Sequence, residues 1–197
     1  GSLHYFNMGS FDLSDDNANS LGTAQGGDFS FDGSFARKFG NDFSLGLTIR
    51  FIHSGIGPSS ALEDQQTSSV NTISSDVSMY YKKSIKQFGK DALLAFGASI
   101  SNIGPKIDYT NSGRKYFLPT NLRIGAANTW SLDNHSQLTF ALDLNKLVVP
   151  TPPIRNSEGS ILDGKDDDRS VVSGMFGSFN DAPGGFKEEF QEISYSP

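Results

Sequence analysis

Three histidines, His4, His53 and His135, are the side chains of this 197-residue chain best suited to acid–base chemistry at neutral pH. His135 lies beside Ser136 and two residues after Asp133, so one short stretch holds the three residue types of a hydrolase triad. The members of a triad approach one another in space, however, and adjacent residues on an extended strand point in opposite directions. We therefore expect a polar turn here, and we predict that the chain has no catalytic residue and is not an enzyme.

Acidic residues gather in two places that could attract calcium, the stretch Asp163–Asp168 and the group Asp12, Asp15 and Asp16. Neither has the spacing or the closing glutamate of a calcium-binding loop. The histidines show no ligand spacing, and the absence of cysteine removes thiolate zinc sites and disulfides. The sequence thus predicts no metal site and no cofactor.

Charge and hydropathy exclude two further classes of protein. Sixteen basic against twenty-two acidic residues give a net charge of −6, which argues against nucleic acid as a partner because neutralising phosphates requires a basic face. No run of about 18 apolar residues exists, so the sequence predicts no transmembrane helix.

Strict alternation of apolar and polar residues is the dominant pattern of the chain. From Phe43 to Phe51 every odd position is large and apolar, and every even position is small or polar. Because successive side chains of a strand point to opposite faces, such a segment has one apolar face and one polar face. Four other segments follow the same rule: Phe29–Phe35, Leu94–Ile100, Leu122–Ala126 and Leu138–Leu144. The fold class is therefore all-β.

About eight strands are expected, and most are long enough to cross a bilayer when tilted. Their predicted ranges are Ser2–Met8, Gly27–Lys38, Asp42–Ser54, Ile73–Ile85, Ala92–Asn102, Thr120–Ser131, Ser136–Val149 and a last strand near Glu189–Tyr195. Tight turns at 39–41, 87–90 and 132–135 alternate with long loops at 55–72, 103–119 and 150–186. Short turns on one side and long loops on the other are typical of an antiparallel transmembrane β-barrel of the outer membrane.

A soluble β-sandwich is the competing interpretation, since its strands alternate as well. Its outward positions would usually carry many lysines, glutamates and threonines. Here the polar faces hold small residues and isolated charges, which suits a crowded barrel interior better: Asp32, Arg50, Asp76, Arg123 and Asp143. The pattern favours the barrel.

The loop 150–186, which we expect to be extracellular, carries apolar side chains on its water-facing stretch. Met175, Phe176 and Phe179 are followed by Pro183. Exposed apolar groups are unfavourable unless they fold back into the barrel mouth or contact a partner, and the sequence leaves both open. We predict that these four residues bind a partner.

Several stretches resemble one family, PorV, the outer-membrane barrel of the type IX secretion system. They are Tyr5–Gly9, Tyr116–Gly125, Asp143–Pro153 and Met175–Gly185, in the family's order and spread over essentially the whole chain. The resemblance implies a barrel similar to the FadL fatty-acid transporters, located in the outer membrane of a Gram-negative, Bacteroidota-type cell. It also implies a role in protein export, without enzymatic activity of its own.

Specific partners follow from the same resemblance. PorV-like proteins are described as receiving secreted cargo with a C-terminal signal domain from the translocon and passing it to a cell-surface attachment complex with a sortase-like component. Outer-membrane lipid is a further expected partner. The alternative function is FadL-like transport of hydrophobic small molecules.

The chain departs from the family in its extent. PorV-like proteins begin with a signal peptide and earlier strands and continue with further strands, and eight strands are fewer than a FadL-like barrel needs. We therefore expect residues 1–197 to be a single but incomplete barrel domain, cut from a longer protein.

Overall fold

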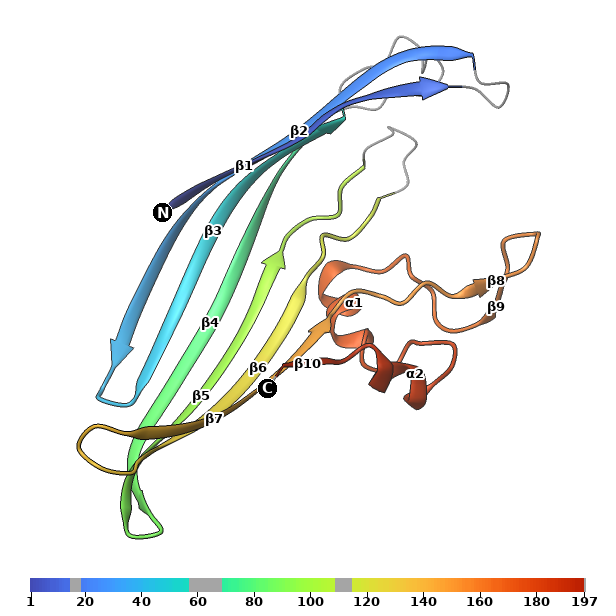
Figure 1. Ribbon diagram of the computed structural model, residues 1–197. Helices are drawn as coiled ribbons and strands as arrows, with labels where there is room; N and C mark the ends of the chain where they lie inside the picture. Colours follow the sequence, from blue (N-terminus) through green and yellow to red (C-terminus); the bar gives the residue numbers. More distant parts are fainter. Residues whose placement is uncertain (15–18, 57–68, 109–114, 197) are drawn as a thin grey trace. The chain divides into compact units, whose positions relative to one another are not determined.

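A computed structural model describes residues 1–14, 19–56, 69–108 and 115–196 of the chain. Most of them form strands of one antiparallel sheet (Figure 1). The seven long strands are β1 (Ser2–Ser14), β2 (Ser20–Phe39), β3 (Phe43–Ile56), β4 (Val70–Gln87), β5 (Lys90–Ile103), β6 (Asn121–Ser131) and β7 (Gln137–Leu147). The short elements are β8 (Ile154–Arg155), β9 (Ile161–Asp163), α1 (Val171–Gly177), α2 (Phe186–Gln191) and β10 (Ser194–Ser196).

Strand order in the sheet is sequential from β1 to β7, and β10 completes it as the eighth strand beside β7. Within the described residues this order is linear, with β1 at one edge and β10 at the other, so the sheet is open. The all-β, antiparallel prediction is confirmed, and an open eight-stranded sheet is consistent with an incomplete barrel.

The chain divides into two compact units, each described here by itself. The first comprises residues 1–34, 48–75 and 104–118, and the second comprises 35–47, 76–103 and 119–197. In the first unit, Ser2 donates a 2.7 Å hydrogen bond to Asp32, whose carboxylate lies 3.8 Å from Arg50. Two of the charges predicted for the polar face therefore neutralise each other.

Register in the second unit sorts side chains into two faces, as the alternation predicts. Ala98 pairs with Ile124, and Ile124 pairs with Leu144. One residue along, Gly97 pairs with Gly125, and Gly125 pairs with Asp143. Since paired residues share a face, the first row belongs to an apolar face and the second to a polar one.

Strand ends differ from the sequence prediction mainly in the first hairpin. β1 continues to Ser14 and β2 begins at Ser20, where the sequence analysis ended the first strand at Met8. The ladder shifts register between Asn7 and Gly9, where Gly9 has φ +72°, a conformation that glycine adopts without steric cost. This irregularity breaks the period of two and hides the rest of the strand from a pattern search.

The last predicted strand is wrong in part. Residues 189–191 of the predicted strand near Glu189–Tyr195 belong to the helix α2, and only Ser194–Ser196 extend the sheet. Phe186 and Phe190 lie four residues apart, which is helical spacing, and glutamates 188 and 189 in the first turn favour the positive end of the helix dipole. Among the residues that the structure describes, neither helix approaches the length and hydropathy of a membrane-crossing one.

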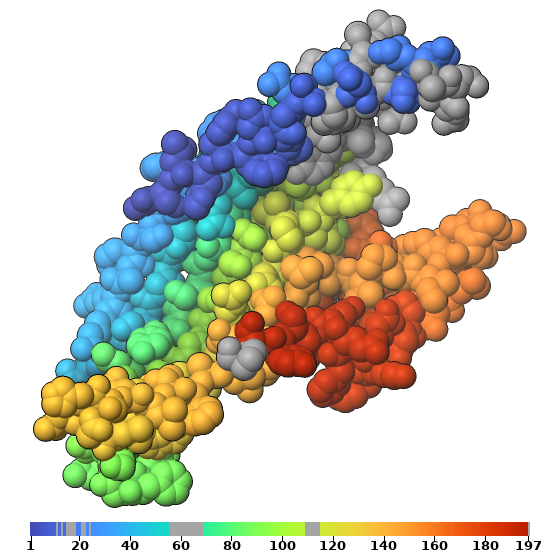
Figure 2. All heavy atoms as spheres, viewed as in Figure 1, coloured from blue at the N-terminus to red at the C-terminus, as the bar shows by residue number. Residues whose placement is uncertain are grey.

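Residues 150–186, predicted as one long loop, contain defined structure. They hold the β8–β9 hairpin and α1, and α2 follows directly. The space-filling view shows the chain after β7, coloured orange to red, packed into a continuous body (Figure 2). We call residues 148–193 the C-terminal segment.

Candidate functional site

The Asp133–Ser136 stretch is a turn, as the sequence analysis expects. One carboxylate oxygen of Asp133 accepts hydrogen bonds of 2.8 Å from the backbone amides of both His135 and Ser136. The amide of His135, followed by Ser136, lowers the pKa of Asp133 below its usual value. One oxygen of the carboxylate is thus engaged with its own turn, which is the structural role that the sequence analysis expects.

The acidic stretches are engaged in a similar way. Asp167 pairs with Arg155 at 2.6 Å, and Asp163 accepts the amide of Gly164 at 2.8 Å. Asp12 accepts a hydrogen bond from Thr23 at 3.0 Å, whereas Asp15 and Asp16 lie outside the described residues. Within the described ranges, no three acidic or histidine side chains form a group that could hold a metal ion.

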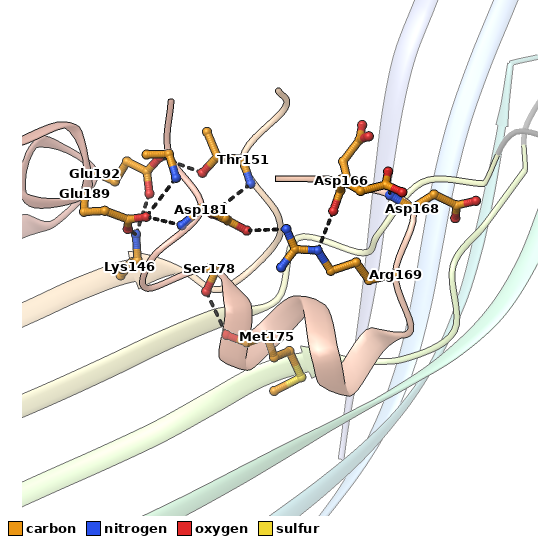
Figure 3. A network of polar contacts seen from close by, with 12 residues as sticks. Lys146, Thr151, Asp166, Asp168, Arg169, Met175, Ser178, Asp181, Glu189 and Glu192 are labelled. Carbon is orange, nitrogen blue, oxygen red and sulfur yellow. Dashed lines mark hydrogen bonds and ion pairs between the residues drawn. The ribbon is translucent and has the colours of Figure 1, made fainter. Parts of the chain in front are cut away.

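A buried ion cluster joins β7 to the C-terminal segment (Figure 3). The ammonium of Lys146, only 5% exposed, lies 3.0 Å from a carboxylate oxygen of Glu189 and also contacts Glu192. Both glutamates come from α2 or its C-cap, more than forty residues along the chain. We call Lys146, Glu189 and Glu192 the latch. Desolvating three charges is costly unless each finds a partner, so the latch stabilises one specific position of α2.

Lys146 lies on the apolar face of the sheet. It pairs with Leu122 in register, and it follows Leu142 and Leu144 at intervals of two residues. A lysine among these residues would be unfavourable in an apolar environment, and the glutamates of α2 neutralise it. Residues 189–192 therefore cover the apolar face at the loop end of β7.

Glu189 is held by more than the lysine. Its second carboxylate oxygen accepts hydrogen bonds from the amides of Asp181 at 2.8 Å and Ala182 at 3.0 Å. Burial raises the pKa of Glu189, but these amides and the Lys146 ammonium outweigh it, so the pKa lies below its usual value. Glu189 is charged at neutral pH and ties the residues before α2 to β7.

Asp181 is the second buried acid of this segment. Its carboxylate accepts the Thr151 amide at 3.4 Å and lies 3.7 Å from the Arg169 guanidinium. Burial raises the pKa of Asp181 above its usual value, and the Thr151 and Arg169 contacts offset only part of that effect. Asp181 thus joins the start of the segment to the residues on both sides of α1.

α1 is positioned by contacts at its two ends. The Ser170 side chain caps the N-terminus by accepting the Ser173 amide, and Ser178 donates to the Met175 carbonyl at 2.8 Å (Figure 3). Gly177 faces the Arg169 guanidinium, which a side chain at that position would push aside. Both ends of α1 are capped although it has only seven residues, and we call α1 together with the residues up to Pro183 the platform.

The four residues predicted to bind a partner all lie in or next to this platform. Phe176 on α1 is 77% exposed, and Met175 beside it is half-buried. Phe179 is about half exposed, and its ring lies 5.8 Å from the Lys146 ammonium, so part of its surface covers the latch. Pro183 is half-buried against Gly164. Phe176 is the member with the most free surface.

Sequence reasoning missed a second aromatic pair. Phe186 and Phe190 of α2 are 78% and 61% exposed, and their ring centroids are 5.2 Å apart in an edge-to-face arrangement. Their spacing of four residues is the signal that could have revealed them. The sequence analysis placed Phe186 at the end of a loop and Phe190 in a strand, so this spacing was not recognised.

A hollow of about 450 Å³ lies over the middle of β3–β7. Small residues line much of it, Gly97 and Gly125 among them, together with Arg123 and Asp143. A Cβ at Gly125 would collide with the Asp143 carboxylate, whereas one at Gly97 would meet only the Met79 carbonyl oxygen at 3.9 Å. Two predicted polar-face charges, Arg123 and Asp143, therefore border the same hollow.

Comparison with known proteins identifies the family of the chain. The family model described as type IX secretion system protein PorV matches residues 1–154, which comprise β1 to β7 and the first residue of β8. None of the curated proteins searched matches the chain. The resemblance found in the sequence is confirmed: the chain belongs to the PorV family of type IX secretion system proteins.

Proposed function

We propose that this outer-membrane component of the type IX system binds secreted cargo through the C-terminal signal domain of the cargo. It then passes the cargo from the translocon to the attachment complex at the cell surface. The family assignment supports a role in secretion. The observation that carries cargo binding is the exposed Phe176 on a platform whose position is fixed by buried polar contacts.

Fixed presentation matters for the affinity of such a surface. Binding energy concentrates in a few aromatic and long apolar side chains that a partner surrounds and desolvates. Ordering a loose loop on binding would subtract from this energy, and the contacts of Asp181 and Glu189 remove that cost in advance. Phe176, with Met175 beside it, meets both requirements.

The binding test compares serine variants of the full-length protein in the outer membrane. Replacing Met175, Phe176 and Phe179 together is expected to abolish cargo capture while the protein still reaches the membrane. Val172→Ser, which replaces an exposed apolar residue of α1 outside the predicted set, is the matched control and should leave capture unchanged. Phe179→Ser alone separates loss of the partner surface from disturbance of the latch, because Phe179 also covers Lys146. Undiminished capture of signal-bearing cargo by both Phe176→Ser and the triple variant would overturn the assignment of this surface.

A cellular experiment tests the pathway independently of the surface. When the full-length gene is deleted, signal-bearing cargo is expected to accumulate in the periplasm and to be missing from the cell surface. Normal cargo display with slower uptake of a hydrophobic nutrient would instead support the alternative, a FadL-like transporter. The charged Arg123 and Asp143 at the hollow weigh against a continuous apolar path along this part of the sheet.

A further inference from the structure

We propose that α2 is a lipid anchor, with Phe186 and Phe190 inserted at the boundary between headgroups and acyl chains of the outer leaflet. The latch holds the helix against the outer wall of the sheet in this position. The inference rests on the outer-membrane location and is independent of cargo binding. The occupant of the Phe186–Phe190 surface is lipid, because the latch lies on the face of the sheet that contacts lipid.

The strand register shows which face of the sheet α2 covers. In an outer-membrane barrel the apolar face of the sheet contacts lipid. Lys146 belongs to that face by its register with Leu122, and Tyr195 of β10 belongs to it by its register with Leu144. Because Glu189 and Glu192 contact Lys146, α2 lies on the lipid side of the wall at β7 and not over the polar face.

The length of the apolar row on β7 places the latch at one border of the apolar band. The apolar row of β7 begins at Leu138, which pairs with Trp130 beside the short turn, and it ends at Lys146. The eight steps from residue 138 to residue 146, at about 3.3 Å each, span about 26 Å along the strand. With the usual tilt of barrel strands, this corresponds to about 20 Å across the membrane, close to the apolar band of about 25 Å. Trp130 and the latch therefore mark the two borders of the band.

The side chains of α2 suit that border. Aromatic side chains are enriched where the apolar band meets the headgroups. Phe186 and Phe190 form an exposed pair on one side of α2. Tyr195, 77% exposed, lies on the apolar face of β10, which follows α2 after two residues. Lys187 and Glu188 between the two rings suit headgroups and water. α2 thus leads directly into the lipid-facing side of the sheet.

The test places single fluorescent labels on the full-length protein in a cysteine-free background. Phe186→Cys and Phe190→Cys are the test positions, Lys187→Cys is the matched control on the same helix, and Leu142→Cys is a control on the lipid-facing wall. Each variant carries a nitrobenzoxadiazole label and is reconstituted into phosphatidylcholine vesicles. Some vesicles contain lipid with a spin label near the headgroup, and others contain lipid with a spin label deep in the acyl chain.

We expect the labels at 186 and 190 to emit at shorter wavelength than the label at 187. They should lose most fluorescence to the shallow spin label and little to aqueous iodide, whereas the label at 142 should respond more to the deep one. Quenching by iodide equal to that at 187 would overturn the proposal. Protection from iodide without quenching by either lipid would also overturn it, and would assign the pair to a protein partner or a second copy.

A second variant tests the latch. Lys146→Met removes the charge that both glutamates contact. In the double variant Lys146→Met and Phe190→Cys, the label at position 190 should lose the quenching by the shallow spin label and become accessible to iodide. A barrel that still shows heat-dependent gel migration establishes that the wall is folded. Unchanged lipid quenching in this variant would refute the role of the latch. Failure of cargo capture leaves both results unaffected, so the two proposals are separable.

Discussion

Replacing Lys146 by methionine is the most informative perturbation of the C-terminal segment. Methionine keeps much of the side-chain volume, but it leaves Glu189 and Glu192 without their shared cation. Removing one partner of a buried ion pair costs about 3–5 kcal/mol, because the other charge stays buried and uncompensated. The lower end applies here, since Glu189 keeps the amides of Asp181 and Ala182 and Glu192 is partly exposed.

Hydrogen exchange of the α2 amides measures this loss locally. About 3 kcal/mol corresponds to about 150-fold faster exchange, or to complete loss of protection where the segment opens more readily than that. The amides to follow are those of Glu188, Glu189 and Glu192, which are bonded within or at the ends of α2. The amides of β6 and β7 in the same sample report whether the sheet is intact.

Two further variants make the experiment decisive. Lys187→Met removes an exposed lysine of the same helix and should leave exchange unchanged. Combining Lys146→Met with Glu189→Gln and Glu192→Gln removes the unpaired charges and should restore part of the protection. Protection in Lys146→Met equal to that of the unmodified protein would refute the reasoning that the latch positions α2.

Three other outcomes are expected. Gly104→Ala should destabilise the protein by about 1–3 kcal/mol because a Cβ there would lie 2.6 Å from the backbone oxygen of Ile73, whereas Gly97→Ala should be nearly neutral, as read from thermal unfolding of the full-length barrel by gel migration. Asp133→Ala should lower the unfolding temperature slightly in the same assay, because the turn loses two backbone hydrogen bonds. Since the pKa of Glu189 is lowered in the folded state, the contribution of Glu189 to stability is complete above its ordinary pKa of 4.5 and is lost as pH falls through the lowered value. The exchange protection of the α2 amides should therefore hold from pH 7 to about 5 and then fall. A loss of protection beginning near pH 6 would contradict this.

The sheet was largely predictable because each strand carries its own local signal. In β6 and β7, the alternation of Leu122–Ala126 and Leu138–Leu144 is enough to assign both the strand and its two faces. The extension of β1 and β2 beyond Gly9 was not predictable, because the register shift there depends on the pairing of two strands and interrupts the alternation within each of them. Local sequence patterns therefore predict the middle of each strand better than its ends.

The candidate site depended on contacts that no local pattern contains. Lys146 falls inside the predicted strand Ser136–Val149, but its glutamate partners lie more than forty residues further along. Phe176 was predicted as a partner-binding residue because an apolar run is visible in one stretch of sequence, and its exposure is consistent with that prediction. Phe186 and Phe190 were missed because two residues at helical spacing, within a six-residue helix, are too weak a signal against a neighbouring strand.

The pairing of β10 with β7 has a consequence for the architecture. The chain leaves the sheet at Leu147 and returns at Ser194 to pair with Asn145 of the same strand. All residues between these two points form the connection of a single hairpin, so its length and content can change without shifting the register of any other strand. Closing a longer connection costs only about 0.6 kcal/mol for each doubling of its length. The wall and its appendage are therefore separable modules, and new contact surfaces can be exchanged at this position while the membrane-embedded framework stays the same.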